Sequence, residues 1–352
     1  MDFWIPEDIL INIIARVPIC YYPTISLVSK RFRSLVASPE IYTARSLLGC
    51  TEHCLYALLY SVNTKDYRWY VLHRKANGSH RLVLIPSIPP MSYSYEGSFV
   101  AIGSKIYVLG ARYGDSSTSS EHVIDCRSHM VKPIISIPMQ MYPAVPSVID
   151  KKVYVIGVCR SSSPHSKMVM VFDTETQMWE EPVMMTTQDL EKLDLGYVSS
   201  RFVVIGDKVY MKSYKYSFVY EPKEDKLEID EMLNFKRWEH ACVVDEVLYY
   251  FDYGKNKLRA YETRHKCWVV VKGLEELLDD AGPSWWSRTV SYGGNVAVFL
   301  HKRKYRDETT EIRCVEIALE RRQQGEIWGK VEWCEVVLEG AFTLMKSVAV
   351  II

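Results

Sequence analysis

The sequence has no excess of charge of either sign. Lysine and arginine together number 43 of the 352 residues, and aspartate and glutamate also number 43. A chain with so weak a net field is not a general binder of nucleic acid or of an anionic membrane surface. No apolar run approaches the ~18 residues that a membrane-spanning helix needs. We therefore expect no nucleic acid and no membrane among its partners.

Sequence signatures of catalysis are also missing. There is no glycine-rich phosphate loop, no His-Glu-x-x-His zinc pair and no nucleophile elbow. Cys50, His53 and Cys54 lie close together, but they supply only three ligands at an unusual spacing for zinc. We therefore predict a protein with no catalytic residues, no metal and no cofactor.

Two further features bear on the compartment. Residues 1–8 are acidic rather than basic, so they do not form a secretory signal. The 9 cysteines are odd in number and scattered, without the spacing of a disulfide framework. Free thiols suit a reducing compartment, and we predict an intracellular protein, cytoplasmic, nuclear or both.

What the sequence has in abundance is a repeated pattern. An apolar run, a tight polar turn and a second apolar run recur at 99–110, 148–157, 203–211 and 242–251. β-Branched and aromatic residues on both sides of a turn of Gly, Asp or Lys indicate a β-hairpin. Each of these copies therefore predicts two antiparallel strands.

A second pattern follows each hairpin. An acidic residue is followed six positions later by a large apolar residue, and the acidic position advances by 48 residues twice and then by 41. A period in the forties indicates a repeat architecture. The four pairs are Asp125 with Val131, Asp173 with Trp179, Glu221 with Leu227, and Glu262 with Trp268.

About four short strands in each repeat indicate a propeller. One small sheet cannot bury both of its faces, whereas radial stacking of several sheets buries the faces and leaves only short edges. A sandwich is the alternative, but it gives no reason for near-constant spacing. Length predicts six blades: clear repeats at 98–131, 145–179, 200–227 and 240–268, a looser one at 290–337, and a first blade that a C-terminal strand, 341–352, completes.

Residues 1–48 have a helical period instead. Pro6 suits the first helical position, and Pro18 ends the first apolar run. A second helix is expected at 26–36, and a third begins at Ser38 and Pro39. Three such short helices make a poor independent core, yet their apolar residues cover more than one face. This segment either binds another protein or caps the propeller, and physical reasoning alone leaves both open.

The helical segment resembles an F-box over its whole length. The opening pair Ile5-Pro6, the proline at position 18 after the first helix, and the basic and aromatic block 30–33 are all in register with that motif. The later repeats resemble degenerate kelch repeats, since the double glycine is reduced to Gly110-Ala111 and Gly157-Val158. With the tail at 320–333, nearly the entire chain resembles the plant F-box/kelch group.

The resemblance implies a small all-α F-box of three helices, residues 1–48, followed by an all-β kelch-type propeller, residues 49–352. It implies a non-catalytic subunit of a Skp-cullin-F-box ubiquitin ligase. The F-box would bind a Skp-type adaptor, and through it a cullin scaffold, while the propeller holds an unknown protein substrate. By position, the adaptor-facing residues would be Ile5, Pro6, Leu10, Ile14, Val17, Pro18 and Leu27.

Loops that leave the second strand of each blade emerge on one side of a propeller, where a substrate is expected. Aromatic residues and arginine are common at the energetic centres of interfaces. The candidates on these loops and on the long segment 272–288 are Arg112, Tyr113, Arg160, Tyr214, Tyr216, Tyr253, Trp285 and Trp286.

Two alternatives remain at this point. One is a kelch-propeller enzyme that resembles a copper oxidase and carries an unrelated helical cap. The other is an adaptor-bound scaffold that never presents a substrate for ubiquitin.

Overall fold

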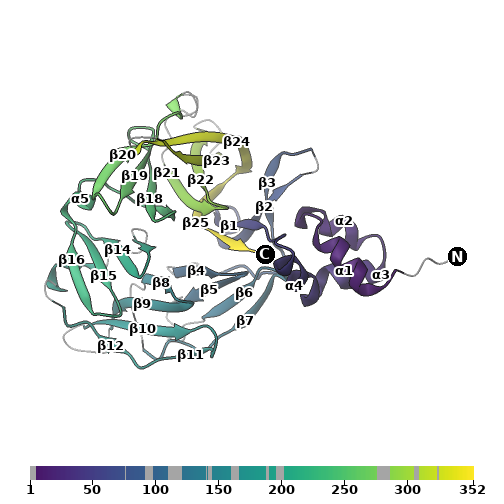
Figure 1. Cartoon of the computed structure of the whole chain (residues 1–352), viewed down its shortest axis with the longest axis horizontal. Coiled ribbons are helices and arrows are strands. Elements are labelled where there is room, and N and C mark those ends of the chain that lie inside the picture. Colours follow the sequence, from purple (N-terminus) through teal and green to yellow (C-terminus); the bar gives the residue numbers. More distant parts are fainter. Residues whose placement is uncertain are drawn as a thin grey trace.

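The chain forms a small helical unit beside a ring of six β-sheets (Figure 1). This arrangement is seen in a computed structural model, and it confirms the predicted order of helices followed by a six-bladed propeller. The structure describes residues 5–75, 77–91, 98–109, 121–139, 141, 145–159, 166–187, 190–195, 202–275, 286–304, 309–322 and 325–352.

Each blade is an antiparallel sheet. In order from the inner to the outer strand, the first blade holds β25 (Phe342–Ile351), β1 (His53–Ser61), β2 (Asp66–Arg74) and β3 (His80–Leu84). The second holds β4 (Ser98–Ile102), β5 (Lys105–Leu109), β6 (His122–Asp125) and β7 (Met130–Pro133). The third holds β8 (Val145–Ile149), β9 (Lys152–Val158), β10 (Lys167–Asp173) and β11 (Met178–Trp179), with β12 (Val183–Met184) also paired to β10.

The remaining three blades follow the same order. The fourth holds β13 (Phe202–Ile205), β14 (Lys208–Lys212), β15 (Ser217–Glu221) and β16 (Lys226–Ile229). The fifth holds β17 (Cys242–Val244), β18 (Val247–Asp252), β19 (Lys257–Glu262) and β20 (Cys267–Val270). The sixth holds β21 (Trp286–Tyr292), β22 (Asn295–Lys304), β23 (Thr309–Arg321) and β24 (Ile327–Gly340).

The ring closes through its inner strands. Each of β25, β4, β8, β13, β17 and β21 contacts the inner strand of the next blade, and β21 contacts β25. The strand from the far end of the chain, β25, pairs with β1 from His53 opposite Ile351 to Ser61 opposite Phe342. Because this pairing covers both the inner edge of β1 and the gap between the last and first blades, no long strand edge is left open there.

Tight turns between the first two strands of the blades follow from local sequence. Asp150 and Lys151, and likewise Asp245 and Glu246, have positive φ, as do Gly293 and Gly294. A positive φ places a residue in the left-handed region of backbone conformation. Two successive residues there are typical of the two-residue hairpin turn, whose twist matches the right-handed twist of the strands it connects. The polar pairs that predict the hairpins in the sequence are therefore the residues that turn the chain.

The six-residue spacing after each acidic residue also has a structural cause. Asp173 faces Met178 across the ladder, so Phe172 faces Trp179, and the same register recurs in the second, fourth and fifth blades. The carboxylate of Asp173 accepts the backbone N–H of Glu175 at 2.8 Å. Backbone hydrogen bonds of this kind hold the pKa of Asp173 below its usual value.

The fourth residue after each acidic position lies at the end of the turn between the third and fourth strands, where the chain reverses direction. These residues all have positive φ although none is glycine: His129, Gln177, Asp225 and Lys266. A residue in this region at the end of a short loop lets the next strand return in register. The repeat thus encodes the turn as well as the strand.

Aromatic side chains fill the space between blades. Trp238 is fully buried between the fourth and fifth blades, together with Tyr210 and Tyr261. The Tyr261 hydroxyl donates to the carboxylate of Asp230 at 2.8 Å, and burial raises the pKa of Tyr261 well above its usual value. Large aromatic residues whose polar ends are satisfied suit such seams between sheets.

The helical unit contains α1 (Glu7–Ala15), the short 3₁₀ helix η1 (Ile19–Tyr21), α2 (Tyr22–Ser26), α3 (Lys30–Ala37) and α4 (Pro39–Leu47). The expected second helix at 26–36 is divided, because α3 begins only at Lys30. Residues 27–29 separate α2 from α3. Ser29 is the N-cap of α3, because its hydroxyl accepts a hydrogen bond from the backbone N–H of Phe32 at 3.2 Å. Ser38, which we expected to cap α4, makes no side-chain cap bond.

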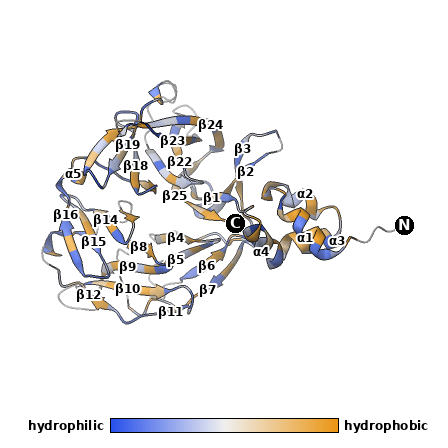
Figure 2. Cartoon of the chain, in the orientation of Figure 1, coloured by the Kyte–Doolittle hydropathy of each residue, from blue (hydrophilic) through white to orange (hydrophobic). Residues whose placement is uncertain are grey.

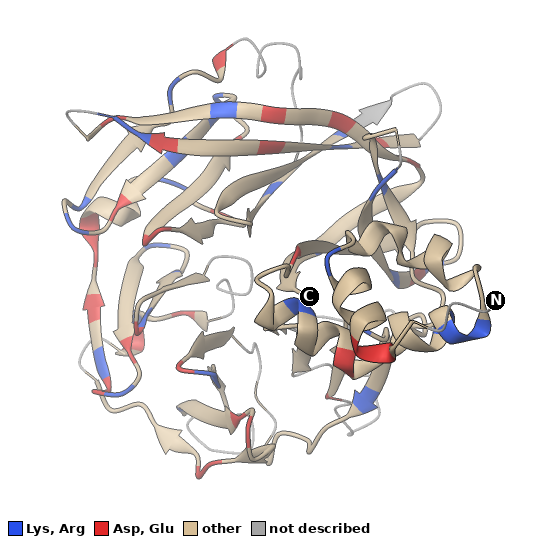
Figure 3. Ribbon diagram, turned by 45° about the vertical axis from the view of Figure 1, so that its right-hand side comes forward, with Lys and Arg blue, Asp and Glu red and all other residues tan. Residues whose placement is uncertain are grey.

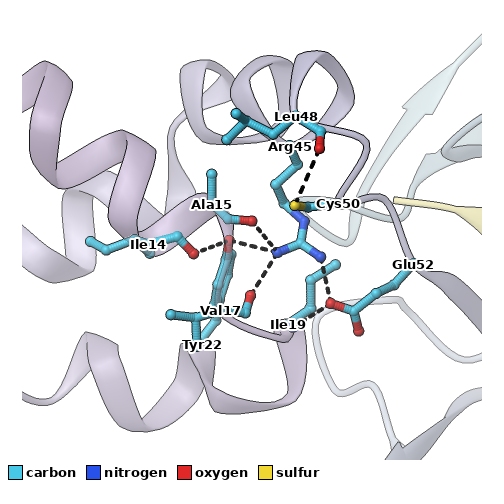
Figure 4. Close-up of polar contacts among 9 residues, drawn as sticks. All are labelled: Ile14, Ala15, Val17, Ile19, Tyr22, Arg45, Leu48, Cys50 and Glu52. Carbon is cyan, nitrogen blue, oxygen red and sulfur yellow. Dashed lines mark hydrogen bonds and ion pairs between the residues drawn. The ribbon is translucent and has the colours of Figure 1, made fainter.

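A buried arginine joins the helical unit to the propeller (Figure 4). Arg45 of α4 is 1% exposed, and its Nη1 donates to the carbonyl oxygens of Ala15 at 2.9 Å and Val17 at 2.7 Å. Its Nη2 forms an ion pair with Glu52, whose Oε1 also accepts the N–H of Ile19. The backbone of Glu52 in turn exchanges two hydrogen bonds with Ile352.

No single helix in the described part of the chain is long and apolar enough to cross a membrane. The bent pair Glu7–Ala15 and Ile19–Ser26 does pass that test by length and composition.

Removal of Arg45 tests the junction. The substitution Arg45→Met is expected to lower the free energy of unfolding by roughly 3 kcal/mol, because it leaves Glu52 and two carbonyl groups without their partner. Denaturant unfolding followed by circular dichroism measures the change. The control Arg33→Met removes an exposed arginine from the same unit and should change stability by under about 0.5 kcal/mol. Equal effects of the two substitutions would contradict this role of Arg45.

The seam that closes the ring gives a second prediction. Leu344 of β25 is 1% exposed and packs among residues of the first and sixth blades. Leu344→Ala should cost about 2–5 kcal/mol of stability, since it opens a cavity at the seam. Val336→Ala, at a 39% exposed position on β24, serves as the control and should cost far less. Thermal unfolding of the two variants measures the change in melting temperature. Equal melting temperatures for the two variants would show that the seam is not tightly packed at Leu344.

Candidate adaptor-binding surface and propeller face

The helical unit leaves large apolar side chains uncovered. On α1, Ile9 is 47% exposed and Ile13 is 52% exposed, while Leu27 and Val28, in the break between α2 and α3, are 76% and 68% exposed. Figure 2 shows hydrophobic residues on α1 and α2, at the end of the molecule away from the ring. An apolar group of this kind is typical of a protein-binding surface.

The sequence-predicted adaptor residues divide into two sets. Ile5, Pro6, Pro18 and Leu27 are exposed, and Val17 is half-buried. Leu10 and Ile14 are only 6% and 3% exposed and belong to the core that the helices share with the first two blades. Side chains so deeply covered offer almost no contact area, so we reassign these two to the helical core.

Sequence reasoning left three exposed residues out of the predicted site: Ile9, Ile13 and Val28. The helical period contained the signal for the first two, because positions 9 and 13 are four residues apart and share one side of the helix, rotated by about 100° from the side of Leu10 and Ile14. Val28 gave no such signal. It is exposed because the helix expected at 26–36 is interrupted before Lys30.

The helical unit contacts the ring on one side, and the predicted substrate loops that carry Tyr214 and Tyr253 lie on the other. The unit leads directly into the start of β1, and the Tyr42 hydroxyl donates to the carbonyl oxygen of Arg127, in the turn between β6 and β7, at 3.2 Å. Second strands begin on this side in every blade, because the sheets share one order. The described loops that follow second strands, at 213–216 and 253–256, therefore open on the opposite face.

Two of the predicted substrate residues are well exposed on that opposite face. Tyr214 follows β14 and is 73% exposed, and Tyr253 follows β18 and is 51% exposed. Tyr216 is half-buried and packs edge-on against Phe218, with ring centroids 6.0 Å apart. Its side chain therefore contributes to packing within the fourth blade. Trp286 begins β21, whereas Arg112, Tyr113, Arg160 and Trp285 lie outside the described residues.

Phe235 is a further exposed aromatic residue near Tyr214, and no repeat pattern predicted it. It is 72% exposed and ends the short helix α5 (Glu231–Asn234). Asn234, its neighbour, donates from its side-chain amide to the carbonyl oxygen of Lys215 at 2.7 Å. This hydrogen bond brings Phe235 beside the loop that carries Tyr214.

A basic group lies at the inner strands where the sixth blade meets the first. Arg288 of β21 is 7% exposed, and its Nε donates to the carbonyl oxygen of Leu344 at 3.3 Å. Its Nη1 is 2.7 Å from Nδ1 of His240. Burial lowers the pKa of Arg288, and burial together with the charge of Arg288 lowers the pKa of Lys346. His240 therefore packs against an inner strand, near the ring centre.

Metal-ligating residues do not gather anywhere in the described part of the chain, where no three His, Cys, Asp or Glu side chains are placed to hold one ion.

Comparisons with known proteins match both parts of this structure. A family model described as an F-box domain matches residues 3–44, and one described as FKB95, Kelch-repeats domain matches residues 69–338. F-box/kelch-repeat protein At4g38940 of Arabidopsis thaliana is 48% identical over 361 residues, covering 99% of this chain and 94% of that protein. F-box/kelch-repeat protein At4g39240 of the same plant is 40% identical, covering 95% of this chain and 86% of that protein. With both domains matched and relatives aligned over nearly its full length, the chain belongs to the F-box/kelch-repeat protein family.

Proposed function

We propose that this chain is the substrate-recognition subunit of a Skp-cullin-F-box ubiquitin ligase. An F-box with kelch repeats implies a protein of the substrate-adaptor type, and an F-box implies binding of a Skp-type adaptor. In this proposal the adaptor connects the chain to a cullin scaffold, the propeller holds a protein substrate, and other subunits transfer ubiquitin.

The observation that carries the proposal is the apolar surface of the helical unit. Ile9, Ile13, Leu27 and Val28 are each roughly half exposed or more, although many other large apolar side chains in the unit are covered. Leaving four such side chains in water is unfavourable by about 25 cal/mol per Å² of apolar area. A partner that covers them recovers this free energy, and about 800 Å² on each partner is the usual size of a stable interface.

The two-sided arrangement of the propeller supports the second half of the proposal. The adaptor surface belongs to a unit held at one face of the ring, and the exposed Tyr214, Phe235 and Tyr253 lie on or beside loops of the other. A substrate bound there does not compete with the adaptor for space. Exposed aromatic residues are the type that dominates binding energy in protein interfaces.

An intracellular location, cytoplasmic or nuclear, is part of the same proposal. All nine cysteines are free thiols in the structure, and four of them are buried. Buried thiols without a disulfide partner suit a reducing compartment.

Substitution of the exposed apolar residues tests adaptor binding. The triple variant Ile13→Asp/Leu27→Asp/Val28→Asp should weaken binding of a purified Skp-type adaptor at least 100-fold, because charged side chains would be desolvated in an apolar interface. Isothermal titration calorimetry measures the change. Leu47→Asp alters another exposed leucine, 84% exposed at the end of α4, and should leave the affinity within about threefold. Absence of adaptor binding by the wild-type chain would refute the proposal.

The buried residues Leu10 and Ile14 give a different expectation. Leu10→Ala should lower the free energy of unfolding by about 2–5 kcal/mol, since the side chain is 6% exposed in the helical core. Folded protein of this variant should still bind the adaptor, with affinity reduced by less than about tenfold. A large loss of affinity without a loss of stability would restore Leu10 to the interface.

The propeller face is tested separately from the adaptor surface. Mass spectrometry of plants that lack the chain should identify proteins that accumulate. The wild-type chain should restore their turnover, whereas Tyr214→Ala/Tyr253→Ala should not, although it still binds the adaptor. If accumulation is absent while adaptor binding is intact, the chain is an adaptor-bound scaffold rather than a receptor for degradation.

A further inference from the structure

A large groove separates the helical unit from the first blade. Its volume is about 1980 Å³, and its walls come from η1, α2 and α3 on one side and from β2, β3 and the turn between them on the other. Ligand pockets for small molecules have volumes of about 300–1,000 Å³. A groove of this size therefore suits a segment of polypeptide rather than a small molecule.

Positive charge from several elements converges on this groove. Arg16 follows α1, Arg33 lies in α3, Arg74 ends β2, Lys75 begins the turn after it, and Arg127 lies between β6 and β7. All five residues are exposed, and none forms an ion pair within the described part of the chain. Figure 3 shows basic residues on the helical unit and on the strands beside it.

The acidic residues of the groove balance only part of this charge. Glu52 is already paired with Arg45, and Glu332 with Lys330 at 3.0 Å. Glu316 accepts hydrogen bonds from the side chain of Asn295 at 2.6 Å and from the indole of Trp333 at 2.6 Å. It keeps its negative charge, because both of these hydrogen-bond donors are neutral. The excess of positive charge in the groove is thus local, in a chain whose formal net charge is zero.

Apolar and aromatic groups lie beside the charges. Val71 and Val83 of the first blade, both half-buried, line the groove. The ring of His80 stacks on Trp333, with centroids 3.9 Å apart and planes inclined by 16°. A surface with both features binds chains that alternate acidic and apolar side chains, since carboxylates meet the cations while the apolar residues leave water.

We propose that this groove binds an acidic, extended peptide segment of a partner protein. The charge of the groove selects acidic side chains, and its volume of about 1980 Å³ admits a polypeptide strand. Nucleic acid is the less suitable occupant, because the balanced charge of the whole chain gives little of the long-range attraction that nucleic-acid binders use. The groove borders the adaptor surface, since Pro18 lines it, but Ile9, Ile13, Leu27 and Val28 do not line it, and it lies apart from the opposite propeller face.

Peptide selection with the full-length chain tests the proposal. Random peptides of about twelve residues, long enough to span about 40 Å when extended, are displayed on phage and selected on the immobilised protein. The wild-type chain should enrich peptides rich in Asp and Glu. The best peptide, made with a fluorescent label, is then titrated by anisotropy. Its affinity should fall as salt rises, because exposed charge pairs are screened.

Two charge reversals compare the groove with the rest of the surface. Arg74→Glu/Lys75→Glu should weaken binding of the labelled peptide about tenfold or more, since two attractive contacts become repulsive. Lys132→Glu/Lys257→Glu changes the net charge equally at exposed positions on β7 and β19, outside the groove, and should change affinity by less than about twofold. Adaptor affinity, measured on each variant, should be unchanged and shows that the variants are folded.

Several results would overturn the proposal. They are selection of no peptide above background, enrichment of peptides that are not acidic, or equal loss of affinity in both double variants. A labelled single-stranded DNA oligonucleotide that binds more tightly than the peptide, and loses affinity only in the Arg74/Lys75 variant, would assign the groove to nucleic acid instead.

Discussion

One carboxylate, that of Glu52, holds together parts of the chain that are far apart in sequence. Its side chain accepts from Arg45 of α4 and from the N–H of Ile19, while its backbone pairs with Ile352. Arg45 in turn binds the carbonyl groups at the end of α1, which a helix leaves without partners. The first and last helices of the helical unit and the end of the final strand therefore meet at a single polar centre.

This centre fixes the direction in which the helical unit points. A short linker of five residues, 48–52, would leave two domains free to turn if nothing else joined them. Here the side chains of α1 and α4 also share one core with Tyr56 of β1 and Ile352. Because the helices and the ring are joined by both polar and apolar contacts, the adaptor surface keeps a constant orientation to the opposite propeller face. Such an arrangement suits a receptor that must present its cargo at a set distance.

The sequence predicted the parts of the fold that are local. Turn pairs such as Asp245-Glu246, and the spacing from Asp173 to Trp179, depend on a few neighbouring residues, so a repeat reveals them. The candidate site was harder to predict. Leu10 and Ile14 belong to the core around which the helices pack, and no local pattern shows which apolar face of a short helix its neighbours in the fold will cover. Arg45 gave no signal either, because its partners Ala15, Val17 and Glu52 come together only in the folded chain.

The same centre also shapes the groove between the helices and the first blade. Arg45 and Glu52 line its inner end and neutralise one another there, so the charge that remains belongs to the exposed residues Arg16, Arg33 and Arg74 nearer the rim. Since Glu52 holds η1 against the ring through the N–H of Ile19, it also sets the distance between the two walls. The contact that stabilises the junction thus also forms part of the groove wall. A peptide bound in the groove would contact the helices and the first blade at the same time. Its affinity would therefore depend on the contact between Arg45 and Glu52.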